Sequence, residues 1–156
     1  PTNEPDFLRL CDEFDLTMHA RAAEGEPEQS TQIFLTDDDS DTGLWYRLAS
    51  LSYMGGSFSV GDVPNPMIAA ALGSAVVHGP IIEKFQHAYA RLSETGATQS
   101  LKDEGDLSQR VAAMMEPDQC ADMAATGWQV VSEGAVATDR LVELALQKLG
   151  FGDLHL

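Results

Sequence analysis

The feature that most constrains this chain is an uncharged apolar run over residues 67–77, enclosed by two proline-containing boundaries. Before the run, Asn65 is a favourable N-cap, and Pro66 falls at the first helical position, where its missing N–H costs nothing. After the run, Gly79 and Pro80 interrupt any helix. A helix that is apolar on every side is buried, and one of this length is too short to span a membrane. We therefore expect a buried helix over residues 67–77 at the centre of the fold.

The residues that follow this run predict an amphipathic helix. Ile81, Phe85, Tyr89 and Leu92 recur at helical spacing, while charged and polar residues occupy the opposite side. Gly96 is suited to the left-handed position that ends many helices. The two helices together are expected to form the centre against which the others pack.

The rest of the chain predicts further short helices and little sheet. Helices are expected over residues 4–24, 44–54, 106–115, 117–133 and 138–149, short strands over 31–36 and 57–60, and a mobile loop over 98–105. The predicted fold is mainly α: a single globular domain spanning residues 1–156, built as a bundle of six to seven short helices around the buried apolar helix. At most a small two-stranded β element is expected, and residues 152–156 are expected to be a flexible tail.

Charge is the strongest global property of the sequence. Nine basic residues stand against 25 acidic ones, for a formal net charge of −16. Residues 12–41 alone hold ten carboxylates and the single Arg21. Such a surface repels phosphate and anionic lipid, so direct binding to nucleic acid or to a membrane is not expected. It suits a basic protein partner.

The function predicted from this charge is a protein-interaction module without catalysis of its own. It would act as an inhibitor, as an immunity or antitoxin-like protein, or as a nucleic-acid mimic, and it needs no cofactor. The acidic residues expected to bind the basic partner are Asp12, Glu13, Asp15, Glu24, Glu26, Glu28, Asp37, Asp38, Asp39 and Asp41. The two cysteines are far apart and the N-terminal region lacks an apolar targeting core, so we expect a cytoplasmic bacterial protein.

Two other functions remain open at this point. One is a helical ligand-binding or enzyme-accessory domain, with a pocket beside the central helices. The other is a metal-dependent enzyme that uses two carboxylate–histidine pairs, Asp15 with His19 and Glu83 with His87, each spaced one helical turn apart. The aspartates of residues 37–41 do not fit a calcium loop, because the required glycine and glutamate positions are not filled together. A homodimer through exposed aromatic residues also remains open.

Overall fold

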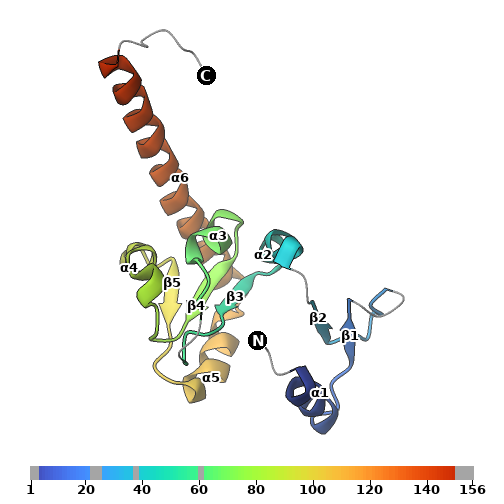
Figure 1. Ribbon diagram of the computed structural model, residues 1–156. Helices are drawn as coiled ribbons and strands as arrows, with labels where there is room; N and C mark the ends of the chain where they lie inside the picture. The colour runs from blue at the N-terminus through green and yellow to red at the C-terminus, as the bar shows by residue number, and fades with distance from the viewer. Residues whose placement is uncertain (1–3, 22–25, 37–38, 60–61, 150–156) are drawn as a thin grey trace. The chain divides into compact units, whose positions relative to one another are not determined.

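The computed structural model describes residues 4–21, 26–36, 39–59 and 62–149. The predicted flexible tail, residues 152–156, lies outside these ranges. The chain divides into two compact units, Pro1–Thr42 and Gly43–Leu156, and each is described by itself (Figure 1). That residues 1–156 form a single globular domain stays a prediction.

The smaller unit combines a short helix with two short strands. Its elements are α1 (Glu4–Glu13), β1 (Met18–Ala20), β2 (Ile33–Leu35) and the 3₁₀ helix η1 (Asp39–Asp41). The two strands pair in parallel, with Met18 opposite Ile33. A strand within residues 31–36 is therefore confirmed. The helix predicted over residues 4–24 is too long, because the chain leaves the helix after Glu13 and its next ordered element is β1.

The larger unit alternates strands and helices around a three-stranded sheet. Its elements are α2 (Thr42–Leu48), β3 (Leu51–Met54), α3 (Pro66–Ala71), β4 (Ala75–His78), η2 (Glu83–Phe85), α4 (Gln86–Glu94), β5 (Thr98–Ser100), α5 (Glu104–Met114) and α6 (Pro117–Lys148). The strand order is β3-β4-β5 and both pairs are parallel. Alternating strands and helices are the pattern that builds a parallel sheet, because each crossover helix returns the chain to the starting edge.

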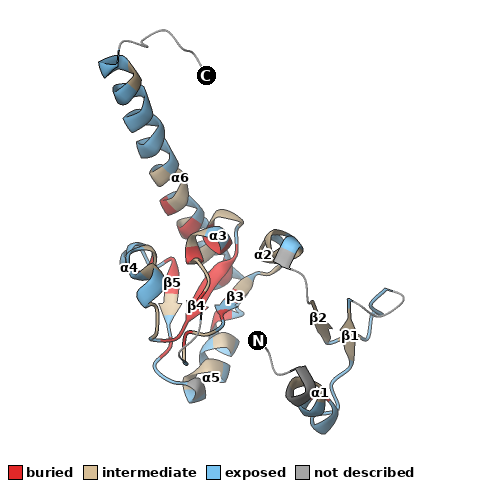
Figure 2. Cartoon of the chain, viewed as in Figure 1, coloured by how far each residue is buried: buried red, intermediate tan, exposed pale blue. Residues whose placement is uncertain are grey.

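The uncharged run does not form one buried helix. Asn65 caps α3 as predicted, since its side-chain oxygen accepts a hydrogen bond from the Met67 N–H at 3.0 Å. The helix ends at Ala71, the chain turns at Gly73 with a φ of 87°, and residues 75–78 continue as β4. All four residues of β4 are buried, which makes it the central strand (Figure 2). The predicted helical bundle is wrong: the fold is mixed α/β with two parallel sheets.

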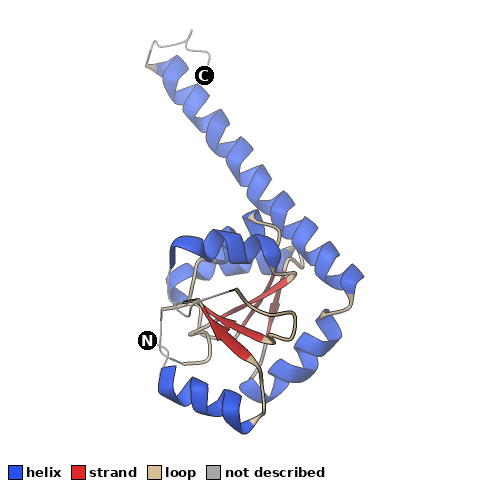
Figure 3. Ribbon diagram, turned by 90° about the vertical axis from the view of Figure 1, so that its right-hand side faces the viewer, coloured by secondary structure: helices blue, strands red, loops and turns tan. Residues whose placement is uncertain are grey.

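Helices cover both faces of the three-stranded sheet (Figure 3). Val76 packs with Met54 and Tyr89 in one core cluster. Its neighbour Val77 points to the other face, where it packs with Leu101 and other residues of a second cluster. A strand buried on both faces has no polar side, so its sequence is continuously apolar rather than alternating.

Further expectations change in the larger unit. The helix predicted over residues 44–54 ends at Leu48, and residues 51–54 form β3. Residues 57–59 lie in a turn rather than a strand, and residue 60 is outside the described ranges. The loop expected over 98–105 contains β5 and the start of α5. Residues 117–148 form one continuous helix of 32 residues, uninterrupted at Gly134, that projects beyond the sheet (Figure 1).

Candidate functional site

The candidate site is the edge of the larger unit at which all three strands end. Because β3, β4 and β5 are parallel, their carboxyl ends lie on the same edge. We call the segments that follow them, residues 55–59, 79–82 and 101–103, the carboxyl edge. In open α/β sheets, ligands bind outside this edge, where the loops between strands and helices converge. Gly56 and Gly79, which follow β3 and β4, allow backbone segments of the chain to approach one another closely, since a Cβ at Gly56 would lie 3.5 Å from the Asp62 backbone.

Ser57 joins two of these segments. It is fully buried, and its hydroxyl donates to the Met54 carbonyl oxygen at 2.5 Å and accepts from the Gly79 N–H at 2.7 Å. Its own carbonyl oxygen accepts from the Ile81 N–H at 2.9 Å. A Cβ on Gly79 would collide with the Ser57 backbone and lie 2.8 Å from a ring carbon of Phe58. The turn after β3 and the turn after β4 are therefore held in one fixed arrangement.

His78, the last residue of β4, is held beside Tyr89 of α4. The imidazole Nδ1 lies 2.6 Å from the Gly79 carbonyl oxygen, and because a carbonyl accepts, Nδ1 carries the hydrogen. The rings of His78 and Tyr89 are 4.5 Å apart, and the Tyr89 hydroxyl donates to the Pro64 carbonyl oxygen at 3.0 Å. Burial lowers the pKa of His78 below its usual value, in spite of the bond to Gly79. The ring is therefore neutral at pH 7, with Nε2 as the acceptor atom.

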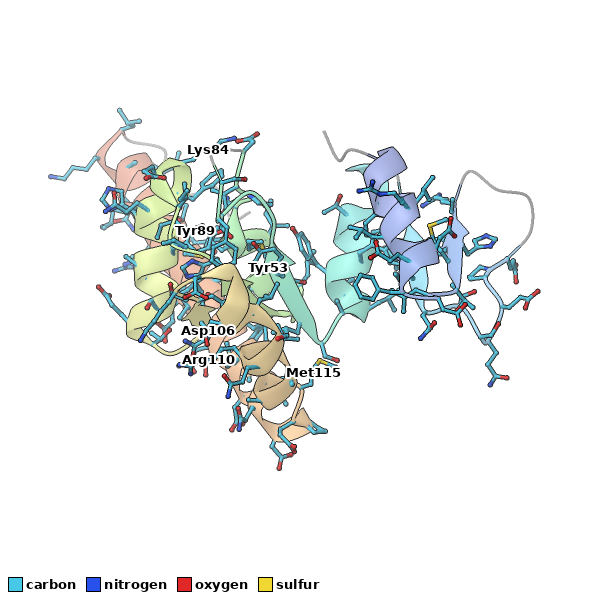
Figure 4. All side chains as sticks on the ribbon, turned by 90° about the horizontal axis from the view of Figure 1, so that it is seen from below. Tyr53, Lys84, Tyr89, Asp106, Arg110 and Met115 are labelled. Carbon is cyan, nitrogen blue, oxygen red and sulfur yellow. The ribbon has the colours of Figure 1, made fainter. Side chains whose placement is uncertain are left out.

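Two lysines belong to the neighbourhood of these segments in sequence. Lys102 follows β5 directly and is exposed. Lys84, in η2, pairs with Asp62 and lies 5.3 Å from the centre of the Phe85 ring (Figure 4). The site thus combines glycine-containing turns with the exposed Lys102, whose ammonium group suits an anionic ligand.

The acidic residues predicted to bind a partner all belong to the smaller unit, Pro1–Thr42. Asp12 and Glu13 end α1, and Asp15 lies in the turn after it with a φ of 53°. Glu26 and Glu28 are exposed, and Asp41 pairs with Arg21. Asp39 lies in η1. Glu24, Asp37 and Asp38 fall outside the described residues.

The predicted metal-binding pairs do not assemble into a site. Asp15 and His19 are not neighbours on a helix, because α1 ends at Glu13 and His19 lies in β1, stacked on Phe34 at 5.7 Å. Glu83 lies in η2 and His87 in α4. Among the residues that the structure describes, no group of three or more His, Cys, Asp or Glu side chains is placed to hold a metal ion.

The carboxyl edge was missed because its signal was assigned to helix ends. Two short apolar runs, residues 51–54 and 75–78, are each followed by glycine, in Gly55-Gly56 and in Gly79-Pro80. A buried apolar run of four to eight residues bounded by turn residues is typical of a strand in a parallel sheet. Two such runs separated by a short helix would have indicated a strand–helix–strand unit and its ligand edge.

No family model matches the chain. Curated relatives do match it, and all those described here are 3-deoxy-D-manno-octulosonic acid (Kdo) transferases. The protein of Rickettsia felis is 24% identical over 125 residues, which is 80% of this chain and 27% of the relative. That of Haemophilus influenzae is 24% identical over 120 residues, or 76% of this chain and 28% of the relative. The chain thus spans between a quarter and a third of the length of these relatives.

A solved structure matches the fold. It is the C-terminal CMP-Kdo binding domain of WaaA from Acinetobacter baumannii, with a TM-score of 0.70 and 24% sequence identity. The match covers 81% of this chain and 67% of that domain. The chain therefore shares the mixed α/β fold of that domain.

These findings correct the predictions drawn from charge. The relatives are enzymes that transfer a sugar acid, and the structural neighbour binds a sugar nucleotide. The prediction of an inhibitor or mimic that binds a basic protein is therefore wrong. The prediction that the protein is a module without catalysis of its own is wrong as well.

Within the described ranges, no helix is both long enough and apolar enough to cross a lipid bilayer. A cytoplasmic location stays a prediction.

Proposed function

We propose that the Gly43–Leu156 unit is the donor-binding part of a Kdo transferase and that it holds CMP-Kdo at the carboxyl edge. The observation that carries the proposal is the fold match over 81% of the chain to a domain that binds CMP-Kdo. The transferases that match in sequence support the same reading. In the reaction, an acceptor hydroxyl attacks the anomeric carbon of Kdo, the bond to the phosphate oxygen breaks, and CMP leaves.

The chemistry of the carboxyl edge fits this donor. CMP-Kdo carries a phosphodiester and a carboxylate, so it is a dianion at neutral pH. Backbone N–H groups in the Gly55-Gly56 turn, with Gly56 at a φ of 77°, are available to approach an anion closely. The Lys102 ammonium supplies a charge on the segment after β5. Ser57 positions the turns and does not itself need to contact the donor.

The net charge of the chain gives the proposal a testable electrostatic signature. With −16 overall, the long-range field repels a dianion, so short-range contacts at the edge must supply the affinity. Added salt screens the repulsion. We therefore expect CMP to bind as tightly or more tightly when salt is raised from low to physiological concentration.

The direct test is an NMR titration of the ¹⁵N-labelled chain with CMP and with CMP-Kdo. Shifts are expected for amides of residues 55–59, 79–82 and 101–103. Ser57→Ala should weaken CMP binding by about tenfold, or 1.4 kcal/mol, because it releases the two turns from each other. Ser59→Ala, an exposed position in the same turn, is the matched control and should change the affinity less than about twofold.

Three results would contradict the proposal. The first is no shift at the carboxyl edge with millimolar CMP-Kdo. The second is a set of shifts confined to the smaller unit. The third is an equal loss of affinity in both serine variants when each is still folded by circular dichroism.

A further inference from the structure

A pocket lies in the larger unit at the opposite edge of the sheet from the carboxyl edge. Its volume is about 280 Å³, and its lining residues are Ser50, Gly73, Met115, Pro117, Cys120, Ala121 and Ala124. Ser50 directly precedes β3, and Gly73 lies in the turn that leads into β4. The pocket is therefore formed at the amino ends of two strands, against the first turns of α6.

The lining is built from small and apolar side chains that share one side of α6. Pro117, Cys120, Ala121 and Ala124 are three, four and seven residues apart, which places them on the same face of the helix. Gly73 contributes no side chain, and a Cβ built there would meet nothing within 4 Å. Small residues on both sides leave the space open.

The polar groups of the pocket are few. The Cys120 thiol is 5% exposed and donates to the Met114 carbonyl oxygen at 2.8 Å, so its hydrogen is already used. Ser50 is exposed and supplies a hydroxyl. Met115, labelled in Figure 4, is 57% exposed and forms a flexible apolar wall. The pocket is open to solvent, because all of its lining residues except Cys120 and Ala124 are exposed. Its lining favours a small, mainly apolar ligand with a hydrogen-bonding group near Ser50.

We propose that this pocket binds a small, mainly apolar molecule of one or two rings, with a hydrogen-bonding group turned toward Ser50. The size follows from volume, since an apolar cavity of about 150 Å³ holds benzene. The pocket here is nearly twice as large and admits a bicyclic ring. Because it is formed by the amino ends of the strands, it is distinct from the carboxyl edge, and a molecule bound there leaves the proposed donor site free.

The test uses 5-fluoroindole as the probe and ligand-observed ¹⁹F NMR with the full chain. Millimolar or tighter binding is expected, seen as broadening and a shift of the probe signal. Ala124→Leu should fill the pocket and weaken binding at least tenfold. Ala125→Leu adds the same side chain at the next residue, which is exposed and does not line the pocket, and should leave binding unchanged.

A second measurement on the unaltered chain keeps the proposal testable if Ala124→Leu does not fold. N-ethylmaleimide should label Cys120 more slowly in the presence of 5-fluoroindole, whereas labelling of Cys11, which belongs to the smaller unit, should not change. The proposal is overturned if the probe shows no binding at millimolar concentration, if both leucine variants lose binding equally, or if both cysteines are protected to the same degree. None of these results depends on whether CMP-Kdo binds.

Discussion

The two halves of α6 have similar proportions of apolar residues, but one half is partly buried and the other is not. In the inner half, residues 117–131, Cys120, Gly127 and Val130 are buried. In the outer half, residues 132–148, which the structure describes completely, no residue is buried, and Val136 and Leu141 are 69% and 67% exposed. Figure 2 shows this change along one continuous helix. One helix thus contains a segment stabilised by tertiary packing and a segment that depends on local hydrogen bonds.

The difference originates where the inner half crosses α3. A Cβ on Gly127 would lie 3.2 Å from the Ala70 Cβ and 3.7 Å from the Ala97 Cβ, so glycine allows the two helices to approach closely. Arg91 of α4 adds a hydrogen bond to the Val130 carbonyl oxygen at 3.2 Å. Beyond this point the helix has left the sheet, and its apolar side chains face outward.

The largest effect is expected for Gly127→Val. The branched side chain would be forced against Ala70, and overpacking of this kind lowers the free energy of unfolding by about 3 kcal/mol. Gly134→Val is the control, because its Cβ meets the flexible guanidinium of Arg91 at 3.4 Å. Urea denaturation measures both, and equal losses would remove the distinction between the halves.

A smaller effect is expected from truncating one valine in each half. Val130, at 4% exposure, belongs to the core cluster with Leu92 and Ala97. Val130→Ala should lower the free energy of unfolding by about 1.5 kcal/mol, from lost transfer energy and the cavity left behind. Val136→Ala should change it by less than about 0.5 kcal/mol, as at most surface positions. Thermal unfolding of the two variants under one condition provides the comparison.

Lowering the pH should also affect the inner and outer halves of α6 differently. His78 has a lowered pKa in the folded chain, so below its usual value of 6.5 the unfolded chain binds the proton more readily. The contribution of the neutral His78 to the free energy of unfolding is therefore fully present above about pH 6.5 and falls as the pH is lowered below that value. Hydrogen exchange, corrected for intrinsic rates, should show inner-half amides losing protection in this window while outer-half amides change little. His78→Gln should remove this pH dependence, and an unchanged slope would contradict the assignment.

The smallest effect, of opposite sign, is expected for Gly134→Ala. Alanine is favoured over glycine in a helix by up to about 1 kcal/mol, and Arg91 can move aside. The same change at Gly127 should not stabilise the chain, because the new Cβ meets Ala70. Circular dichroism melts measure the pair. Stabilisation of similar size in both would show that the crossing with α3 is looser than described.

The sequence predictions succeeded where the cause is local, as at helix caps and turns, and failed where tertiary packing decides the structure. The cap at Asn65, the start of α6 at Pro117 and the turn at Gly96, with a φ of 79°, are local and were predicted. The strand at Ile33–Leu35 lies within the predicted range. The helix predicted from residue 106 begins earlier, at Glu104, because Asp103 is the N-cap and its side chain accepts a hydrogen bond from the Asp106 N–H.

The candidate site could not be derived in this way. Ser57, His78 and Gly79 are brought together by strand register and by hydrogen bonds across 22 residues of sequence. Charge pattern pointed instead to the aspartates of the smaller unit, since a dense run of carboxylates is conspicuous in sequence. Hydrogen bonds between backbone groups and a buried serine cannot be recognised from amino-acid composition.

What the sequence determined by itself is a few local boundaries, namely the cap at Asn65, the start of α6 at Pro117 and the turn at Gly96, because caps, prolines and glycines act on their immediate neighbours. The prediction that residues 67–77 are interior holds for residues 69–70 and 74–77, whereas Ile68 is 50% exposed. Whether residues 75–78 become helix or strand was decided by tertiary structure. A short run without polar residues shows neither a period of 3.6 nor of 2, and β4 is a strand because β3 and β5 satisfy its backbone groups on both sides.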